Sequence, residues 1–192
     1  MKLGVLTNLM GDKPLEEVLA YLKPLGIEAV EIGCGGFPGK AHADPAVLLH
    51  DEKKLQEFKE LIAKYDMVIS GLSAHGNPLH PNKAIAKQFD DDLTGAILLA
   101  EKLGVEVVNC FSGCPGDSES SEHPNWVVCP WPEDFTQVVK WQWEEKLIPY
   151  WKAKVAFAKE HGVHKFALEM HPGFCVYNPE TALRLREAVG PE

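Results

Sequence analysis

The stretch that decides the fold runs from residue 165 to residue 181 and reads KFALEMHPGFCVYNPET. Its first apolar residues predict a short buried strand that stops at Glu169, and His171 follows in a tight loop. Asn178 then predicts a helix N-cap, with Pro179 at the first helical position. A carboxylate and an imidazole at a strand end are typical of an active site in a parallel α/β fold. The alternative is a solvated Glu and a loop His without a role.

The rest of the chain repeats this order of strand, loop and helix. The expected strands cover residues 3–7, 29–32, 67–72, 105–108 and 166–168, and the expected helices cover residues 14–22, 51–65, 83–102, 133–161 and 178–189. The glycine-rich residues 33–36 are expected to form a flexible loop, and the helix over 133–161 is expected to break near Pro149. Residues 112–133 form a long irregular segment, which predicts a functional lid or a disordered loop. Alternating strands and helices predict a parallel sheet, either part of a barrel or an open doubly wound sheet.

Composition limits the classes of function. The chain has 192 residues with 45% apolar and 24% charged side chains, which predicts one globular domain. The net charge of −9 argues against a nucleic-acid partner. No apolar run approaches the roughly 20 residues of a membrane helix, and no signal peptide is expected at the N-terminus. The five cysteines contain no Cys-x-x-Cys pair, so we expect reduced thiols and a cytoplasmic location.

Polar side chains stand at or just after the end of every expected strand. They are Asn8, Glu31, His75, Asn109 and Glu169. The carboxyl ends of parallel strands meet at one end of a barrel, so we expect these side chains to gather around a common mouth. Each residue taken alone is also consistent with a loop residue that has no chemical role, and for Asn8 and Asn109 the two readings are about equally balanced.

Three motifs resemble a known family, the xylose-isomerase-like TIM barrels that include sugar phosphate isomerases and epimerases. The fifth-strand motif is residues 169–173 together with residues 177–181, the third-strand exit is residues 73–78, and the second-strand exit is residues 30–33. The likeness extends over essentially the whole chain. It implies a (β/α) TIM-barrel fold in which residues 1–192 form a single domain with about five of the eight βα units, ending before strand six.

The resemblance also implies an activity: a metal-dependent isomerase or epimerase that moves a proton of a small sugar or sugar phosphate through an enediolate. In such a family Glu169 is a metal ligand and the catalytic acid or base, and His75, His171, Glu31 and Asn109 are candidate substrate-binding residues. The metal is Mn²⁺, Mg²⁺ or Zn²⁺, and strands six to eight supply its Asp, His and Glu ligands. This chain does not extend to those strands, so we expect weak or absent metal binding, and whether the chain is itself an enzyme stays open.

Two alternatives remain. An incomplete barrel exposes a sheet edge and part of its core, which predicts a non-catalytic chain that self-associates into a homo-oligomer. A hydrolase of the endonuclease IV type shares this barrel, but it would need a basic groove for DNA, and the charge of −9 argues against one.

Overall fold

A computed structural model describes residues 1–191 and shows one parallel sheet with its strands in sequence order, β1-β2-β3-β4-β5. The strands are β1 (Gly4–Leu6), β2 (Ala29–Gly36), β3 (Val68–His75), β4 (Val107–Cys110) and β5 (Lys165–Leu168). Each strand pairs only with its neighbours along the chain, as expected when a helical crossover follows every strand. The predicted parallel α/β fold with five βα units is confirmed.

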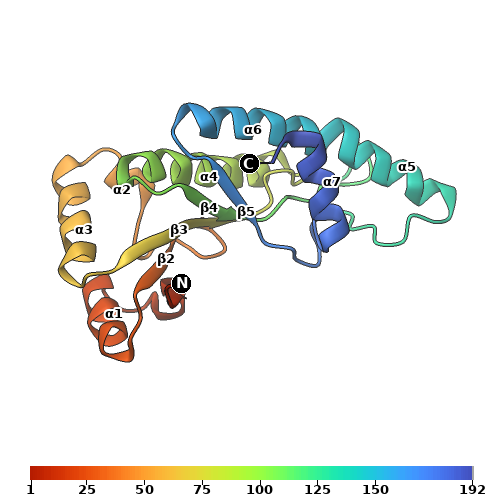
Figure 1. Ribbon diagram of the computed structural model, residues 1–192. Helices are drawn as coiled ribbons and strands as arrows, with labels where there is room; N and C mark the ends of the chain where they lie inside the picture. Colours follow the sequence, from red (N-terminus) through yellow and green to blue (C-terminus); the bar gives the residue numbers. More distant parts are fainter. Residues whose placement is uncertain (192) are drawn as a thin grey trace.

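Helices cover the outer side of this sheet. The α-helices are α1 (Leu15–Leu22), α2 (Pro45–Leu48), α3 (Glu52–Lys64), α4 (Lys83–Leu103), α5 (Glu133–Trp141), α6 (Ile148–Glu160) and α7 (Pro179–Val189). Short helical segments also occur: η1 (Thr7–Met10) follows β1, η2 (Lys23–Leu25) follows α1, and η3 (Gln142–Leu147) joins α5 to α6. Figure 1 shows α4 and α6 above the sheet, α1 and α3 beside its first strands, and α7 beyond β5. No helix within residues 1–191 is long and apolar enough to cross a membrane.

The main core lies between the sheet and α4. Ile32, Leu72 and Val108 are register partners on neighbouring strands, and all three are fully buried. Helix α4 contacts β2, β3 and β4 and buries Leu93 and Ile97. Burying such side chains stabilises the fold by about 1.5–3 kcal/mol each. This core fixes the strands whose ends carry the polar residues.

Strand β2 is longer than the sequence predicted, because Gly33 to Gly36 belong to the strand and not to a flexible loop. Close packing explains the glycines. A β-carbon at Gly35 would lie 2.6 Å from the side chain of Asp92, and one at Gly36 would lie 1.8 Å from the carbonyl oxygen of His75. Asp92 accepts a hydrogen bond from the Gly36 N–H at 2.8 Å. Glycine therefore allows β2 to approach β3 and α4 closely.

The helix expected over residues 133–161 is interrupted close to Pro149, as predicted. The π-helical segment η3 separates α5 from α6 and ends at Leu147, two residues before Pro149, whose missing N–H removes a hydrogen bond to the preceding turn. Gln142 of η3 is buried, and its side-chain amide donates to the carbonyl oxygens of Gly116 (2.9 Å) and Asn125 (2.7 Å). The long segment after β4 is thereby held against the helices.

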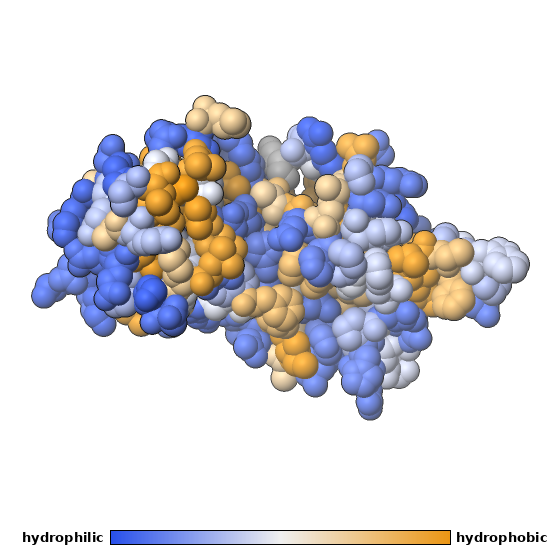
Figure 2. Space-filling view, turned by 90° about the horizontal axis from the view of Figure 1, so that it is seen from below, coloured by the Kyte–Doolittle hydropathy of each residue, from blue (hydrophilic) through white to orange (hydrophobic). Residues whose placement is uncertain are grey.

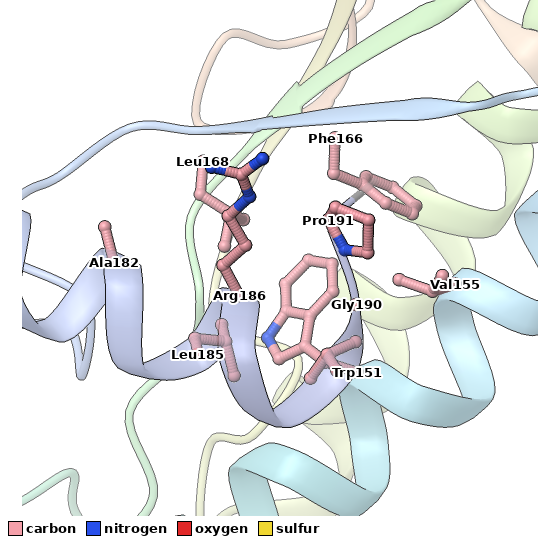
Figure 3. Close-up of a pocket in the computed structure, with 10 residues that line it drawn as sticks. Trp151, Val155, Phe166, Leu168, Ala182, Leu185, Arg186, Gly190 and Pro191 are labelled. Carbon is pink, nitrogen blue, oxygen red and sulfur yellow. The ribbon is translucent and has the colours of Figure 1, made fainter.

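The last helix begins as the sequence predicted. The Asn178 side chain accepts the N–H of Thr181 at 2.8 Å, and the Thr181 hydroxyl accepts the N–H of Asn178 at 3.1 Å. Helix α7 then packs beside α6, and an apolar groove remains between α6, β5 and α7. Figure 3 shows Trp151, Phe166 and Pro191 around this groove.

Strands β1 and β5 are the two edges of the sheet and pair on one side only. Figure 2 shows the molecule from below, with an apolar patch under the part where Figure 1 places the N-terminus. Leu3 is 61% exposed and Leu9 is 79% exposed in this N-terminal part. Apolar residues this exposed beside an unpaired strand edge are a surface on which another chain can pack.

Candidate functional site

The candidate site lies on the inner side of the sheet, opposite the helices. Ser73, Asn109 and Ala167 are register partners on β3, β4 and β5. Since side chains alternate between the two faces of a strand, His75 and Glu169 lie two residues further along on the same face. The Glu169 N–H donates to the carbonyl oxygen of Cys110 at 3.0 Å, which extends the pairing of β4 and β5 by one residue. The backbone of the sheet thus positions the carboxylate.

His75 and Glu169 meet across the end of β4. The Nε2 atom of His75 lies 3.1 Å from Oε2 of Glu169, which is hydrogen-bond distance. The His75 side chain is only 7% exposed, whereas the Glu169 side chain is 56% exposed. The pair therefore combines a fixed imidazole inside the fold with a carboxylate that a small molecule can reach.

Burial lowers the pKa of His75 below its usual value, because the charged imidazolium loses solvation. The negative charges of Glu169 and Glu31 act in the opposite direction, and the nearby His171 adds to the lowering. His75 is consequently neutral at pH 7, with an N–H for the Glu169 carboxylate on Nε2 or a lone pair for a cation. Neutral imidazole is also the form that binds metals.

Aromatic rings form one wall of the site, and the key ring is Phe111. Its centroid lies 4.6 Å from the ring of His75, 4.9 Å from that of His171 and 4.3 Å from that of Phe174. His171 is exposed, and its Nδ1 atom lies 2.6 Å from the carbonyl oxygen of Pro172. The structure thus brings His171 beside the pair through Phe111. We did not predict a role for Phe111, although its position two residues after Asn109 was a usable signal.

Glu31 and Asn109 lie one layer deeper on the same inner face. The hydroxyl of Ser73 donates to the carboxylate of Glu31, and Ser73 is fully buried. Asn109 is half-buried beside Ser73, and a β-carbon at Gly71 would lie 3.0 Å from its amide nitrogen. Four predicted residues therefore share one face of the sheet, namely Glu31, His75, Asn109 and Glu169, with His75 and Glu169 in direct contact.

Asn8 lies in η1 and not at a strand tip. Its side-chain oxygen and the hydroxyl of Thr7 are buried without a hydrogen-bond partner among the described residues. Buried polar atoms of this kind are rare in folded proteins. Thr7 and Asn8 directly follow β1, whose last residue pairs with Glu31, so they lie at the same end of the sheet as the site.

The donor atoms of the site fit a divalent cation in kind but not in number. Glu169 offers carboxylate oxygens and His75 an imidazole nitrogen, both of which Mn²⁺ and Zn²⁺ accept. Within residues 1–191, no group of three or more His, Cys, Asp or Glu side chains is placed to hold a metal ion. Metal binding by Glu169 accordingly stays a prediction.

This arrangement of strands and strand-end residues defines a class of protein. A family profile described as the xylose isomerase-like TIM barrel matches residues 19–192, and the chain belongs to this family. The resemblance inferred from the three motifs is thereby confirmed.

Similar proteins are longer than this chain. The chain is 38% identical over 193 residues to the uncharacterized protein YfiH of Bacillus subtilis (strain 168), and the match covers 100% of the chain and 61% of YfiH. The chain thus spans about three fifths of the length of this relative.

Solved structures share the fold at low identity. A D-tagatose 3-epimerase-like protein has a TM-score of 0.62 and 21% identity, over 96% of this chain and 60% of that one. A putative xylose isomerase from Rhodospirillum rubrum ATCC 11170 has a TM-score of 0.66 and 16% identity, over 98% and 61%. The IolI protein, solved with a bound zinc atom, has a TM-score of 0.63 and 19% identity, over 98% and 59%. These likenesses establish the fold, an incomplete TIM barrel.

Proposed function

We propose that this chain carries the proton-transfer half of a sugar isomerase or epimerase site, with Glu169 as the catalytic acid and base. The observation that supports this most is the 3.1 Å contact between Glu169 and His75 at the carboxyl ends of β3 and β5. Active sites of (β/α) barrels lie at this end. The substrate is a small sugar or sugar phosphate, in keeping with the isomerase and epimerase names among the structural neighbours.

In the proposed reaction, the Glu169 carboxylate removes a proton from the carbon next to the sugar carbonyl. The electrons of that C–H bond form the carbon–carbon double bond of an enediolate, and the carbonyl oxygen becomes negatively charged. In isomerisation, Glu169 then gives the proton to the neighbouring carbon on the same face, while the hydroxyl proton of the first carbon passes to the former carbonyl oxygen. Epimerisation instead needs a second acid on the opposite face of the enediolate, which protonates the first carbon while Glu169 keeps the proton that it removed. The exposed Glu169 oxygens suit this role because substrate can reach them.

The neighbouring residues have supporting roles in this proposal. Neutral His75 donates an N–H to the carboxylate and holds it in place, and His171 and Asn109 bind substrate hydroxyls. Phe111 excludes water from one side of the site, which strengthens the remaining electrostatic interactions. A divalent Mn²⁺, Mg²⁺ or Zn²⁺ ion bound by Glu169 would supply charge stabilisation for the enediolate oxygens.

Solvent exchange tests the proposal directly. The chain is incubated in D₂O with Mn²⁺ and a panel of ketoses and ketose phosphates, and proton NMR follows the loss of the carbon-bound proton. Wild-type chain should catalyse the exchange, and Glu169→Gln should slow it by at least about 100-fold, the usual contribution of a general base. Glu106→Gln is the matched control, because Glu106 is 65% exposed and pairs with Lys165 outside the site. Equal rates for wild type and Glu169→Gln would reject the catalytic role.

A second proposal concerns assembly and rests on the open edges β1 and β5. We expect the 21.3 kDa chain to form a homodimer or larger oligomer that covers an edge. Light scattering after size exclusion measures the mass, and a mass of 21.3 kDa at micromolar concentration would contradict this proposal.

A further inference from the structure

Two cysteines from distant parts of the chain meet beside the candidate site. Cys114 lies at the start of the long segment after β4, and Cys175 lies in the loop between β5 and α7. The N–H of Cys175 donates to the carbonyl oxygen of Gly113, the residue before Cys114, at 3.0 Å, so the backbones of the two segments are in direct contact. Both thiols are free and buried.

The surroundings make the two sulfur atoms chemically different. The Cys114 thiol lies 3.6 Å from the carbonyl oxygen of Pro115, and its interaction with the Cys175 side chain lowers its pKa although burial opposes this. The pKa of Cys175 is raised well above its usual value, first by its interaction with the Cys114 side chain and then by burial. A thiolate-forming sulfur next to a protonated thiol is the arrangement in which one cysteine attacks and the other resolves.

The two cysteines border a surface hollow, where Cys114 is fully buried and Cys175 is 5% exposed. This hollow lies between the long segment and α7 and is also lined by Trp126, Gln142, Tyr177 and Arg184. The other two buried cysteines, Cys34 and Cys110, have their pKa raised mainly by burial, and neither shares a hydrogen bond with another thiol. The pair is thus distinct from the structural cysteines of the core.

We propose that Cys114 and Cys175 form a reversible intramolecular disulfide when the chain meets hydrogen peroxide. The Cys114 thiolate attacks one peroxide oxygen, the O–O bond breaks, hydroxide leaves, and Cys114 becomes a sulfenic acid. The sulfur of Cys175 then attacks the Cys114 sulfur, the S–O bond breaks, and the oxygen leaves as water with the proton of Cys175. One peroxide is reduced to two waters and two thiols are oxidised.

The disulfide would fasten two segments that already touch. The N–H of Val176 donates to the hydroxyl of Ser112 at 2.9 Å, and the N–H of His171 donates to the carbonyl oxygen of Val176 at 3.3 Å. A bond between residues 114 and 175 would therefore fix the loop that carries His171. The modification itself does not depend on the proposed enzymatic function.

The test uses the full chain with Cys129→Ser, because Cys129 is exposed and would otherwise form bonds between chains. The folded protein is treated with peroxide, then denatured and alkylated with a maleimide, and intact mass spectrometry counts the adducts. Of the four remaining cysteines, two should be alkylated after oxidation and all four after reduction. Peptide mapping should find Cys114 joined to Cys175.

Two variants of this protein separate the proposal from general oxidation. Cys175→Ser should form no disulfide, and dimedone should trap a sulfenic acid at Cys114. Cys110→Ala, which removes a buried cysteine outside the pair, should still form the bond. Circular dichroism checks that each variant is folded. If a variant does not fold, the peptide map of the Cys129→Ser protein tests the proposal by itself. Four adducts after peroxide treatment, or a bond that joins other cysteines, would overturn the proposal.

Discussion

The two faces of β5 have opposite characters, although they are built from alternating residues of one short strand. On the outer face, Phe166 and Leu168 line the apolar groove with Trp151 of α6 (Figure 3). On the inner face, Ala167 leads to Glu169, which contacts His75. The strand period of two places packing on one side and chemistry on the other. A change on either face should therefore affect one property and leave the other intact.

The two faces also differ in how their residues are held. The outer face depends on side-chain packing: Trp151 is 1% exposed, and its ring lies edge-on to Phe166 at 5.3 Å. The inner site depends on the backbone, since the ladder between β4 and β5 continues to Glu169. A half-exposed carboxylate contributes little to packing, so the site can lose it without losing the fold.

The largest expected effect is on the outer face. Trp151→Ala removes a fully buried ring and the hydrogen bond from its Nε1 to the carbonyl oxygen of Ser112 (2.8 Å), so the free energy of unfolding should fall by about 3–5 kcal/mol. Urea denaturation followed by circular dichroism measures it. Trp131→Ala is the control, because Trp131 is 77% exposed and its loss should cost less than about 0.5 kcal/mol. Equal effects would show that the groove does not support the fold.

A smaller effect is expected at the start of α7, the helix that closes the groove. Asn178→Ala removes the side chain that caps Thr181 and should lower the free energy of unfolding by about 1 kcal/mol. The same denaturation measurement applies. Asn178→Asp keeps an acceptor for the Thr181 N–H, so it should recover most of the loss. If Asn178→Asp were as unstable as Asn178→Ala, the cap would not be the cause.

These contrasts also show what the sequence could predict. The order of strands and helices followed from apolar periodicity, and the cap of α7 followed from Asn178 and Pro179, because such signals are local. The pairing of Glu169 with His75 was expected from the convergence of parallel strands at one end of a barrel. Local patterns and a topological rule together were enough for these features.

The features that were missed depend on contacts between distant residues. Gly35 and Gly36 were expected in a loop because glycine disfavours strands, but Asp92 and the His75 carbonyl leave no space for a β-carbon. Phe111 was passed over because an apolar residue after a strand is usually a packing residue. Only the three-dimensional structure shows its ring against those of His75 and His171.

The third prediction concerns pH and the inner face. The pKa of His75 is lowered in the fold, so the unfolded chain binds this proton more readily. The stability that His75 contributes is present above its unfolded pKa and is lost as the pH falls from there through the folded pKa. The free energy of unfolding of wild type should therefore fall more steeply between pH 7 and pH 5 than that of His75→Gln. The pKa of His80 is also lowered, but His80 is present in both proteins and contributes equally to the pH dependence of their free energy of unfolding. If the free energy of unfolding had the same slope against pH in wild type and His75→Gln, His75 would bind its proton equally well in the folded and unfolded states.

The smallest expected effect is the change in stability at Glu169, and it tests the comparison most sharply. The Glu169 side chain is 56% exposed, and its backbone bond to Cys110 survives any side-chain substitution. Glu169→Gln should therefore alter the free energy of unfolding at pH 7 by less than about 0.5 kcal/mol. In the same variant the pKa of His75, followed by NMR of its ring protons, should fall further, because the negative charge that raises it is gone. A large loss of stability would show that the inner face, like the outer one, is needed for folding.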